Sequence, residues 1–211
     1  NLIAADPAMS ALIERLRAPH RAKLDETLAT TEGLLYRRGN FNGTLDTLIC
    51  DAMLAERDAQ IALSPGFRWG NSLLPGQTIT RDDIYNATAI SYPATYRIAM
   101  SGARLKEVLE DVADNIFNPD PYYQQGGDMV RVGGLSFTID VGKPAGQRIS
   151  AMALRPRGEP IDPGKDYVVA GWASVNEGTE GPPIWDVVMN YIKKKGTVAP
   201  VESDHIKVVG T

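Results

Sequence analysis

The irregular order of helix-like and strand-like segments constrains the fold more than any other feature of this sequence. Apolar residues recur at helical spacing over residues 44–57, 101–116 and 182–196, whereas short apolar runs of strand length lie between these segments and follow Met129 in series. The strands and helices do not alternate regularly, as they would in a parallel sheet with crossover helices. The chain is therefore predicted to be an α+β protein, with mixed sheets and packed helices.

Capping residues and apolar spacing set the expected boundaries of these elements. Asp6, Thr80 and Ser101 are good N-caps, and Gly196 suits the position after a helix end. Helices are expected over residues 6–28 with a break at Pro19, 44–57, 80–85, 101–116 and 182–196. Strands are expected over residues 33–36, 61–63, 95–100, 129–132, 135–139, 149–154, 167–171 and 206–209.

The chain is predicted to consist of a connector and one domain. Residues 1–30 are expected to be a helical connector, and residues 31–211 the domain. The sequence opens at Asn1 without an initiating methionine or a basic leader segment. We therefore expect this chain to be a fragment, or a product cut from a longer precursor.

Charge and cysteine content exclude several classes of function. Lysine and arginine number 22 against 26 acidic residues, which gives a net charge of −4 and argues against nucleic acid as a partner. No run approaches the roughly 20 apolar residues of a membrane span, so no membrane insertion is expected. Cys50 is the only cysteine and lies among apolar residues at helical spacing, where a small packing residue is expected rather than a nucleophile.

The residues needed for catalysis are scarce. The sequence contains no phosphate-binding G-x-x-x-x-G-K-[ST], no G-x-S-x-G and no H-E-x-x-H. His20 and His205 are the only histidines and lie near opposite ends of the chain, whereas a dimetal site needs several converging ligands. We expect neither catalytic nor metal-binding residues in this chain, and we expect the chain alone to be inactive.

Three segments suit the recognition of an anion. They are a polar turn before a helix at residues 39–46, an arginine between aromatic residues at 65–70, and a glycine-rich stretch at 122–134. Arginine presents a planar set of donors that matches sulfate-like and phosphate-like groups, and free N–H groups at a helix start also suit anions. The sequence thus indicates an anionic substrate.

The order of these motifs resembles the C-terminal domain of the 5′-nucleotidase family of two-domain metallophosphoesterases. The matching segments, over roughly residues 30–195, are Gly39-Asn40 with Asp46, Ser64–Arg68, Gly76–Asp83, Ser91–Tyr96, and Gly102 with Leu105. The resemblance implies the fold of that domain and a role in substrate recognition beside a metallophosphatase domain.

Two stretches resemble one branch of this family in particular, the thiosulfohydrolases of bacterial sulfur oxidation (Sox). They are Tyr36-Arg37-Arg38-Gly39-Asn40-Phe41 and residues 122–134, whereas residues 176–185 depart from the Gly-Gly-Asp-Gly stretch of nucleotidases. The resemblance implies an N-terminal domain with a dinuclear manganese site. It also implies a periplasmic location and a SoxYZ-like sulfur-carrier protein as partner. Hydrolysis of the S-thiosulfonate on the cysteine of that carrier would release sulfate.

The resemblance and the chemistry together suggest roles for individual residues. Arg68 and Arg131 are expected to contact the anionic end of the substrate. Three aromatic residues are expected to line the channel for the carrier arm: Trp69, Tyr92 and Trp172. Asn40 and Asp46 are expected to hold the turn at residues 39–43, and Asp128 either contacts substrate or fixes Arg131.

Two alternatives stay open on sequence grounds. A nucleotidase-type domain for phosphate esters would bind a nucleoside between Tyr92 and Trp172. A protein-docking module without catalytic function would need neither a neighbouring catalytic domain nor an anionic substrate.

Overall fold

The fold is described from a computed structural model, in which residues 3–174 and 179–210 are described. Asn1 and part of the stretch at 176–185 lie outside these ranges. The helices are α1 (Pro7–Arg17), η1 (Ala18–His20), α2 (Arg21–Leu24), α3 (Thr44–Glu56), α4 (Arg81–Thr88), α5 (Gly102–Phe117), η2 (Pro121–Tyr123) and α6 (Ile184–Lys195). The strands are β1 (Thr27–Thr31), β2 (Ile61–Ser64), β3 (Thr78–Thr80), β4 (Tyr96–Ser101), β5 (Arg131–Gly133), β6 (Leu135–Asp140), β7 (Ile149–Leu154), β8 (Glu159–Pro160), β9 (Asp166–Gly171), β10 (Thr197–Val198) and β11 (Ile206–Val209).

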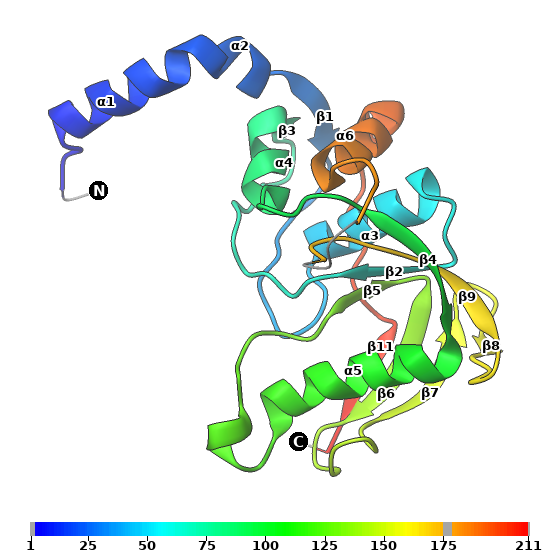
Figure 1. Cartoon of the computed structure of the whole chain (residues 1–211). Coiled ribbons are helices and arrows are strands. Elements are labelled where there is room, and N and C mark those ends of the chain that lie inside the picture. Colours follow the sequence, from blue (N-terminus) through cyan, green and yellow to red (C-terminus); the bar gives the residue numbers. More distant parts are fainter. Residues whose placement is uncertain (1–2, 175–178, 211) are drawn as a thin grey trace.

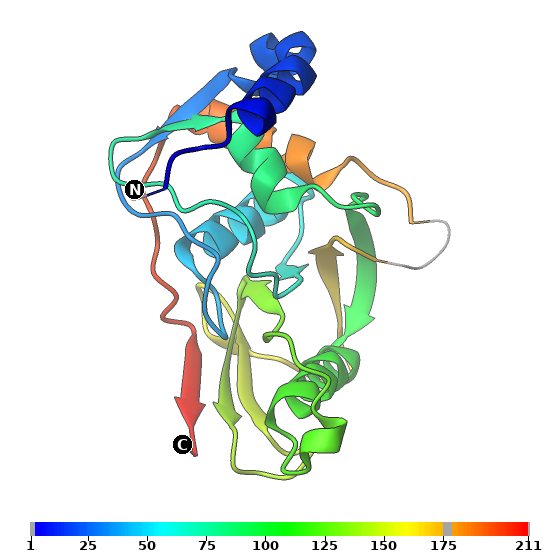
Figure 2. The same cartoon turned by 90° about the vertical axis from the view of Figure 1, so that its left-hand side faces the viewer.

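Three mixed sheets organise the domain. Their strand orders are β10-β1-β3, β4-β9-β2-β5 and β11-β6-β7-β8. Each sheet combines parallel and antiparallel neighbours: β2, for example, runs parallel to β9 and antiparallel to β5. The predicted α+β class with mixed sheets is confirmed. Helices α1 and α2 lie at one end of the molecule, and β11 lies at the other (Figures 1 and 2).

The sheet β4-β9-β2-β5 separates two hydrophobic cores. Ala62 and Ala170 face the core that α3, α4 and α6 complete, whereas Ile61 and Val169 face the core under α5. This division follows from the period of two in a strand, which sends successive side chains to opposite faces. The sheet is therefore packed on both faces, and this packing fixes the positions of the loops that follow its strands.

Most predicted elements occur, and the capping residues act as expected. The side chains of Asp6, Thr80 and Ser101 each accept a hydrogen bond from the first turn of the helix that follows, and Gly196 ends α6 with a φ of 68°. Cys50 is fully buried in the core beneath α3, as expected for a packing residue. No helix in the described ranges is long and apolar enough to cross a membrane.

The first strand was predicted in the wrong place. A strand was predicted over residues 33–36, but β1 occupies Thr27–Thr31 and pairs with β3 and β10. Its threonines are β-branched and suit a strand. Leu35 forms only an isolated bridge with Leu73. The short strands β3, β8 and β10 were not predicted, because two or three residues carry no periodicity.

Candidate functional site

The candidate site begins with Arg68 on the loop that follows β2. Its Nε donates to Asp128 Oδ2 at 2.6 Å, and its Nη2 donates to Asp128 and, at 3.0 Å, to Asn40 Oδ1. Gly66 allows this loop to lie against the segment that leads into β5, because a Cβ there would meet Asp128 Cβ at 2.8 Å. The carboxylate thus holds the guanidinium plane while 55% of the Arg68 side chain remains exposed.

The turn at residues 39–43 is joined to the same place. The side-chain amide of Asn42 pairs with the backbone of Val132 in both directions, at 2.9 and 3.2 Å, as a neighbouring strand would. The backbone of Asn40 accepts from Met129 N at 3.1 Å. Asn40 therefore connects the turn, the Arg68 loop and the approach to β5.

Arg131 lies beneath Arg68 and is fully buried. Its Nη2 donates to Asp128 Oδ2 at 3.0 Å and to Gly39 O at 2.8 Å, and its Nε lies 3.4 Å from Asp46 Oδ2. Burial lowers the pKa of Arg131, and the carboxylates of Asp46 and Asp128 oppose that shift. The geometry places Arg131 behind Asp128 and gives it no direct path to a substrate.

Asp46 extends the cluster to Arg37 and to the start of α3. Its Oδ1 accepts from Arg37 Nε at 2.7 Å, and its Oδ2 accepts from Gly43 N at 3.0 Å. Burial raises the pKa of Asp46, and Arg37 and Arg131 oppose the shift. The bond to Gly43 fixes the start of the helix. Five residues thus form one continuous set, here called the charged chain: Arg37, Asp46, Arg131, Asp128 and Arg68.

An aromatic group lies beside the charged chain. Phe67 stacks on Trp69 with ring centroids 3.7 Å apart, and Trp172 meets Phe67 edge-on at 5.7 Å. Arg37 lies over the Phe67 ring at 5.8 Å from the centroid. Trp69 is 41% exposed and is available to a ligand.

Trp172 and Tyr92 do not face each other across a channel in this structure, and their surroundings differ. Trp172 is only 4% exposed, and its indole N–H donates to Ser64 Oγ at 2.8 Å, so its main contacts lie inside the core. Tyr92, on the loop before β4, is half exposed and makes none of the contacts described above. The structure therefore brings together Asn40, Asp46, Arg68, Trp69, Asp128 and Arg131, with Trp172 on their buried side beneath Arg37 and Phe67. It does not show a Tyr92–Trp172 clamp.

Sequence reasoning missed Arg37 and Phe67. Arg37 belongs to the quoted Tyr36–Phe41 stretch, but nothing in the stretch distinguishes the buried Arg37 from the exposed Arg38.

Among the described residues, no group of three or more histidine, cysteine or acidic side chains is arranged to hold a metal ion. Burial raises the pKa of the Cys50 thiol well above its usual value, which disfavours the thiolate.

Comparison with known proteins assigns the chain to a family. The model of the family described as 5′-nucleotidase, C-terminal domain, matches residues 27–188, which is most of the chain. The chain belongs to the 5′-nucleotidase C-terminal domain family. Among curated proteins no significant match was found.

Solved structures agree with the family assignment. The sulfate thiohydrolase SoxB of Thermus thermophilus, in complex with glycerol, is 37% identical over 96% of this 5′-nucleotidase C-terminal domain, with a TM-score of 0.88. A 5′-nucleotidase precursor from Thermus thermophilus is 21% identical over 97% of it (TM-score 0.75), and the Haemophilus influenzae NAD nucleotidase NadN is 19% identical over 97% (TM-score 0.71). At that identity the two nucleotidases support the fold alone. This chain spans 38%, 43% and 41% of the three solved chains.

Proposed function

We propose that this domain recognises the substrate of a thiosulfohydrolase that acts on the cysteine S-thiosulfonate of a sulfur-carrier protein. In that reaction the terminal S–S bond breaks, water supplies the fourth oxygen of sulfate, and the remaining sulfur stays on the carrier cysteine. The catalytic metal in this proposal is a dinuclear manganese site on a metallophosphatase domain joined to this one. The setting is the periplasm, with a SoxYZ-like protein as the carrier.

The exposed guanidinium of Arg68 is the observation that carries the proposal. Asp128 and Asn40 fix its plane, so little side-chain entropy is lost when its outer edge binds the oxygens of a sulfonate. The exposed Trp69 beside it offers a flat surface against which an extended carrier arm can pack. The 37% identity to the sulfate thiohydrolase of Thermus thermophilus supports a sulfonate rather than a phosphate ester.

The nucleotidase alternative is less well supported by the aromatic residues. A nucleoside clamp needs two accessible rings that face each other, and Trp172 is almost completely buried. Exposure of Tyr92 alone gives a base one stacking surface. The proposed ligand therefore has an anionic end for Arg68 and an extended peptide portion, without a base.

Binding by the chain itself tests this proposal. The probes are a peptide that contains S-sulfocysteine, a stable analogue with the same terminal sulfonate, and adenosine, both titrated by calorimetry. We expect the peptide to bind and adenosine not to bind. Arg68→Ala should weaken peptide binding by about tenfold or more, since a hydrogen bond between charged groups is lost.

A matched control separates recognition from general loss of positive charge. Arg157, with a side chain that is 82% exposed on the turn before β8, can be changed to alanine without touching the charged chain. Arg157→Ala should bind the peptide as tightly as the wild type. Tight binding of adenosine, or unchanged peptide affinity in Arg68→Ala, would contradict the proposed function.

A further inference from the structure

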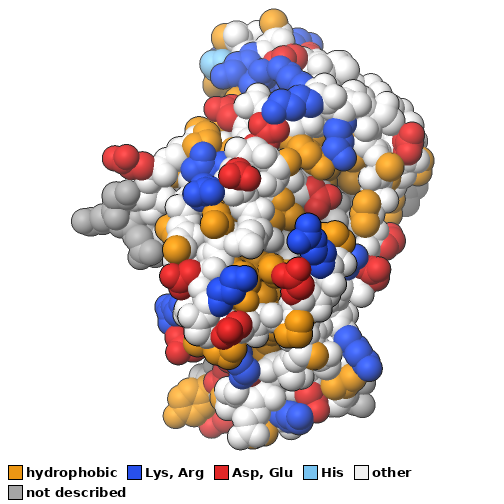
Figure 3. Space-filling view, turned by 90° about the vertical axis from the view of Figure 1, so that its right-hand side faces the viewer, with side chains coloured by type: hydrophobic (Ala, Val, Ile, Leu, Met, Phe, Trp, Pro, Cys, Tyr) orange, Lys and Arg blue, Asp and Glu red, His pale blue; other side chains and the backbone are white. Residues whose placement is uncertain are grey.

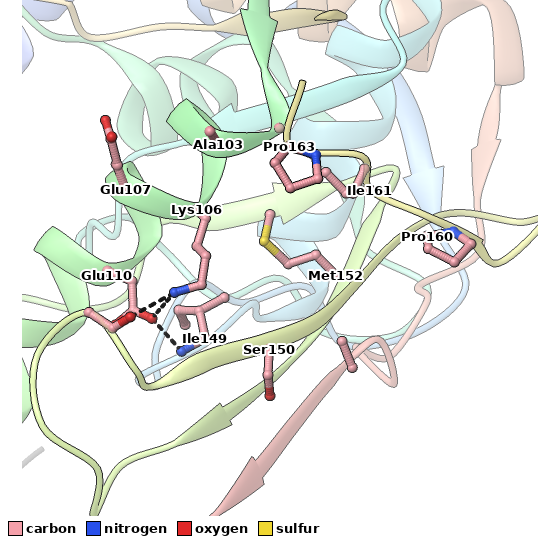
Figure 4. Close-up of a pocket in the computed structure, with 13 residues that line it drawn as sticks. Ala103, Lys106, Glu107, Glu110, Ile149, Ser150, Met152, Pro160, Ile161 and Pro163 are labelled. Atoms are coloured by element: carbon pink, nitrogen blue, oxygen red, sulfur yellow. Dashed lines mark hydrogen bonds and ion pairs between the residues drawn. The ribbon is translucent and has the colours of Figure 1, made fainter. Parts of the chain in front are cut away.

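A hollow that shares no lining residue with the charged chain lies between α5 and β7. It has a volume of about 530 Å³. Figure 4 shows the first turns of α5 on one side, β7 beneath, and the segment at residues 160–163 on the other side. Preformed cavities that bind small molecules have volumes of about 300–1,000 Å³, so this hollow is of suitable size.

The floor of this hollow, here called the α5 groove, is apolar and its mouth is lined by small residues. Ile149 is almost fully buried, and the Met152 side chain points toward Ile161 and Pro163 (Figure 4). Ala103 and Ala151 at the mouth are exposed and too small to fill the space. The groove therefore leaves apolar surface in water, which favours an apolar occupant.

The backbone donors at the α5 end of the groove are already engaged. Gly102 N donates to Lys165 O and Ala103 N donates to Pro163 O, both at 3.0 Å. Arg104 N donates to Ser101 Oγ at 3.2 Å. The first N–H groups of a helix usually attract an anion, but here the protein itself satisfies them.

The donors of the strand edge are engaged as well. The carboxylate of Glu110 accepts from Arg148 N at 3.1 Å and from Ile149 N at 2.8 Å, in place of a neighbouring strand. The ammonium of Lys106 donates to Glu110 at 2.7 Å and to Gly146 O at 2.8 Å. The groove thus has a polar boundary whose groups bond mainly to one another.

The charges around the groove also balance in pairs. Arg104 contacts Glu107 at 3.0 Å and Lys106 contacts Glu110, so neither sign is in excess. Figure 3 likewise shows basic and acidic side chains intermixed over most of the face it presents. A charged ligand would lose its hydration there without gaining a free counter-charge.

We propose that the α5 groove binds a small, uncharged, mainly aromatic molecule. The floor suits a ring, because the Met152 thioether is polarizable and contacts aromatic edges favourably. Pro160 and Pro163 add flat, rigid apolar surface to the lining of the groove. This site is separate from the charged chain and does not depend on the function proposed for it.

Methionine methyl signals provide a direct test. The chain has six methionines, of which Met152 lines the groove, so ¹³C-methyl labelling gives one signal at the site and others elsewhere as internal controls. Titration with indole should shift the Met152 signal saturably, with a Kd of about 0.1–1 mM for so small a ligand. Indole-3-acetate and tryptamine, with the same ring and a negative or positive charge, should bind several-fold more weakly.

Two variants block the groove and a third is their control. Ala103→Trp and Glu107→Trp place a ring at the mouth from the same face of α5, and each should weaken indole binding by about tenfold or more. Asp111→Trp adds the same ring at an exposed α5 position outside the groove and should leave binding unchanged. The absence of a saturable Met152 shift, an equal shift at the exposed Met9, or tighter binding of a charged analogue would overturn the proposal.

Discussion

Two of the buried arginines in this domain, Arg131 and Arg148, have different surroundings. Arg131, in the charged chain, faces Asp46 and Asp128, whose side chains are themselves completely buried. Arg148, beneath α5, pairs with Asp114 at 2.7 Å, and 32% of the Asp114 side chain is exposed. Arg148 also donates to Phe117 O at 3.2 Å, which fastens β7 to the end of α5.

The exposure of the partner carboxylates indicates different roles for the two buried arginines. Water can reach the partner of Arg148, so this ion pair joins a helix to a sheet at modest electrostatic cost. Arg131 is enclosed between two buried carboxylates, one of which also holds the exposed Arg68. A fully enclosed cluster that ends at one exposed guanidinium suits a role in orienting that group, which we assign to substrate recognition.

Removal of Asp46 should have the largest effect. Asp46→Ala leaves Arg37 and Arg131 buried with one carboxylate fewer, and such losses cost about 3–5 kcal/mol of unfolding free energy. Urea unfolding followed by tryptophan fluorescence measures the change. A loss below about 1 kcal/mol would mean that the enclosed cluster is no more costly to break than a surface pair.

Asp128→Asn should have the next largest effect. The amide keeps the shape of the side chain but loses the charge that holds Arg68 and Arg131 together, so we expect a loss of about 2 kcal/mol. The Nε–H signal of Arg68 in ¹⁵N NMR spectra should also broaden or move toward the position of a free arginine. An unchanged Arg68 signal would remove Asp128 from its orienting role.

Asp114→Ala should cost less than Asp46→Ala. Solvent reaches this carboxylate and can replace part of its interaction with Arg148, so we expect a loss of about 1–2 kcal/mol in the same urea experiment. Equal losses in the Asp46 and Asp114 variants would erase the distinction between the two buried arginines.

Asp114 should also contribute to the acid sensitivity of the domain. Hydrogen bonds from Arg148 and Asn118 hold the pKa of Asp114 below its usual value near 3.8. The unfolded chain therefore takes up this proton at a higher pH than the folded one. The stabilisation is present above pH 3.8 and is lost as the pH falls through the lower folded pKa.

The matching variant isolates that contribution. Asp114→Asn should show a flatter decline of unfolding free energy below about pH 4 than the wild type, since the other carboxylates are common to both proteins. Urea midpoints measured from about pH 3 to about pH 6 give the comparison. Parallel curves would contradict the role assigned to the Asp114–Arg148 pair.

The sequence was most informative where periodicity and capping act together. The long helices α3, α5 and α6 and the strands β6 and β7 were predicted from these local signals. Strand β1 was misplaced because its position depends on pairing with strands that lie far along the chain. Such pairing leaves no trace in a short window of sequence.

In the candidate site too, local sequence signals identified residues, whereas contacts between distant segments could not be predicted. Arg68 and Arg131 were singled out because arginine beside glycine suits an anion, and Asp128 was noted as a residue that either contacts substrate or fixes Arg131. Which of these side chains is buried and which is exposed was not predictable, because burial depends on how three segments that are distant in the sequence pack together. Arg37 was missed and Trp172 was expected in a channel wall for this reason, and the apolar α5 groove gave no sequence signal.

Sulfate release from a carrier-bound S-thiosulfonate tests the central claim most directly. The measurement needs a two-domain enzyme in which this chain is joined to a metallophosphatase domain, with wild type, Arg68→Ala and Arg157→Ala compared. We predict that Arg68→Ala lowers kcat/KM by about tenfold or more while Arg157→Ala leaves it unchanged. Wild-type turnover by the Arg68→Ala enzyme, or no sulfate release by the wild type, would contradict the proposed role of this domain.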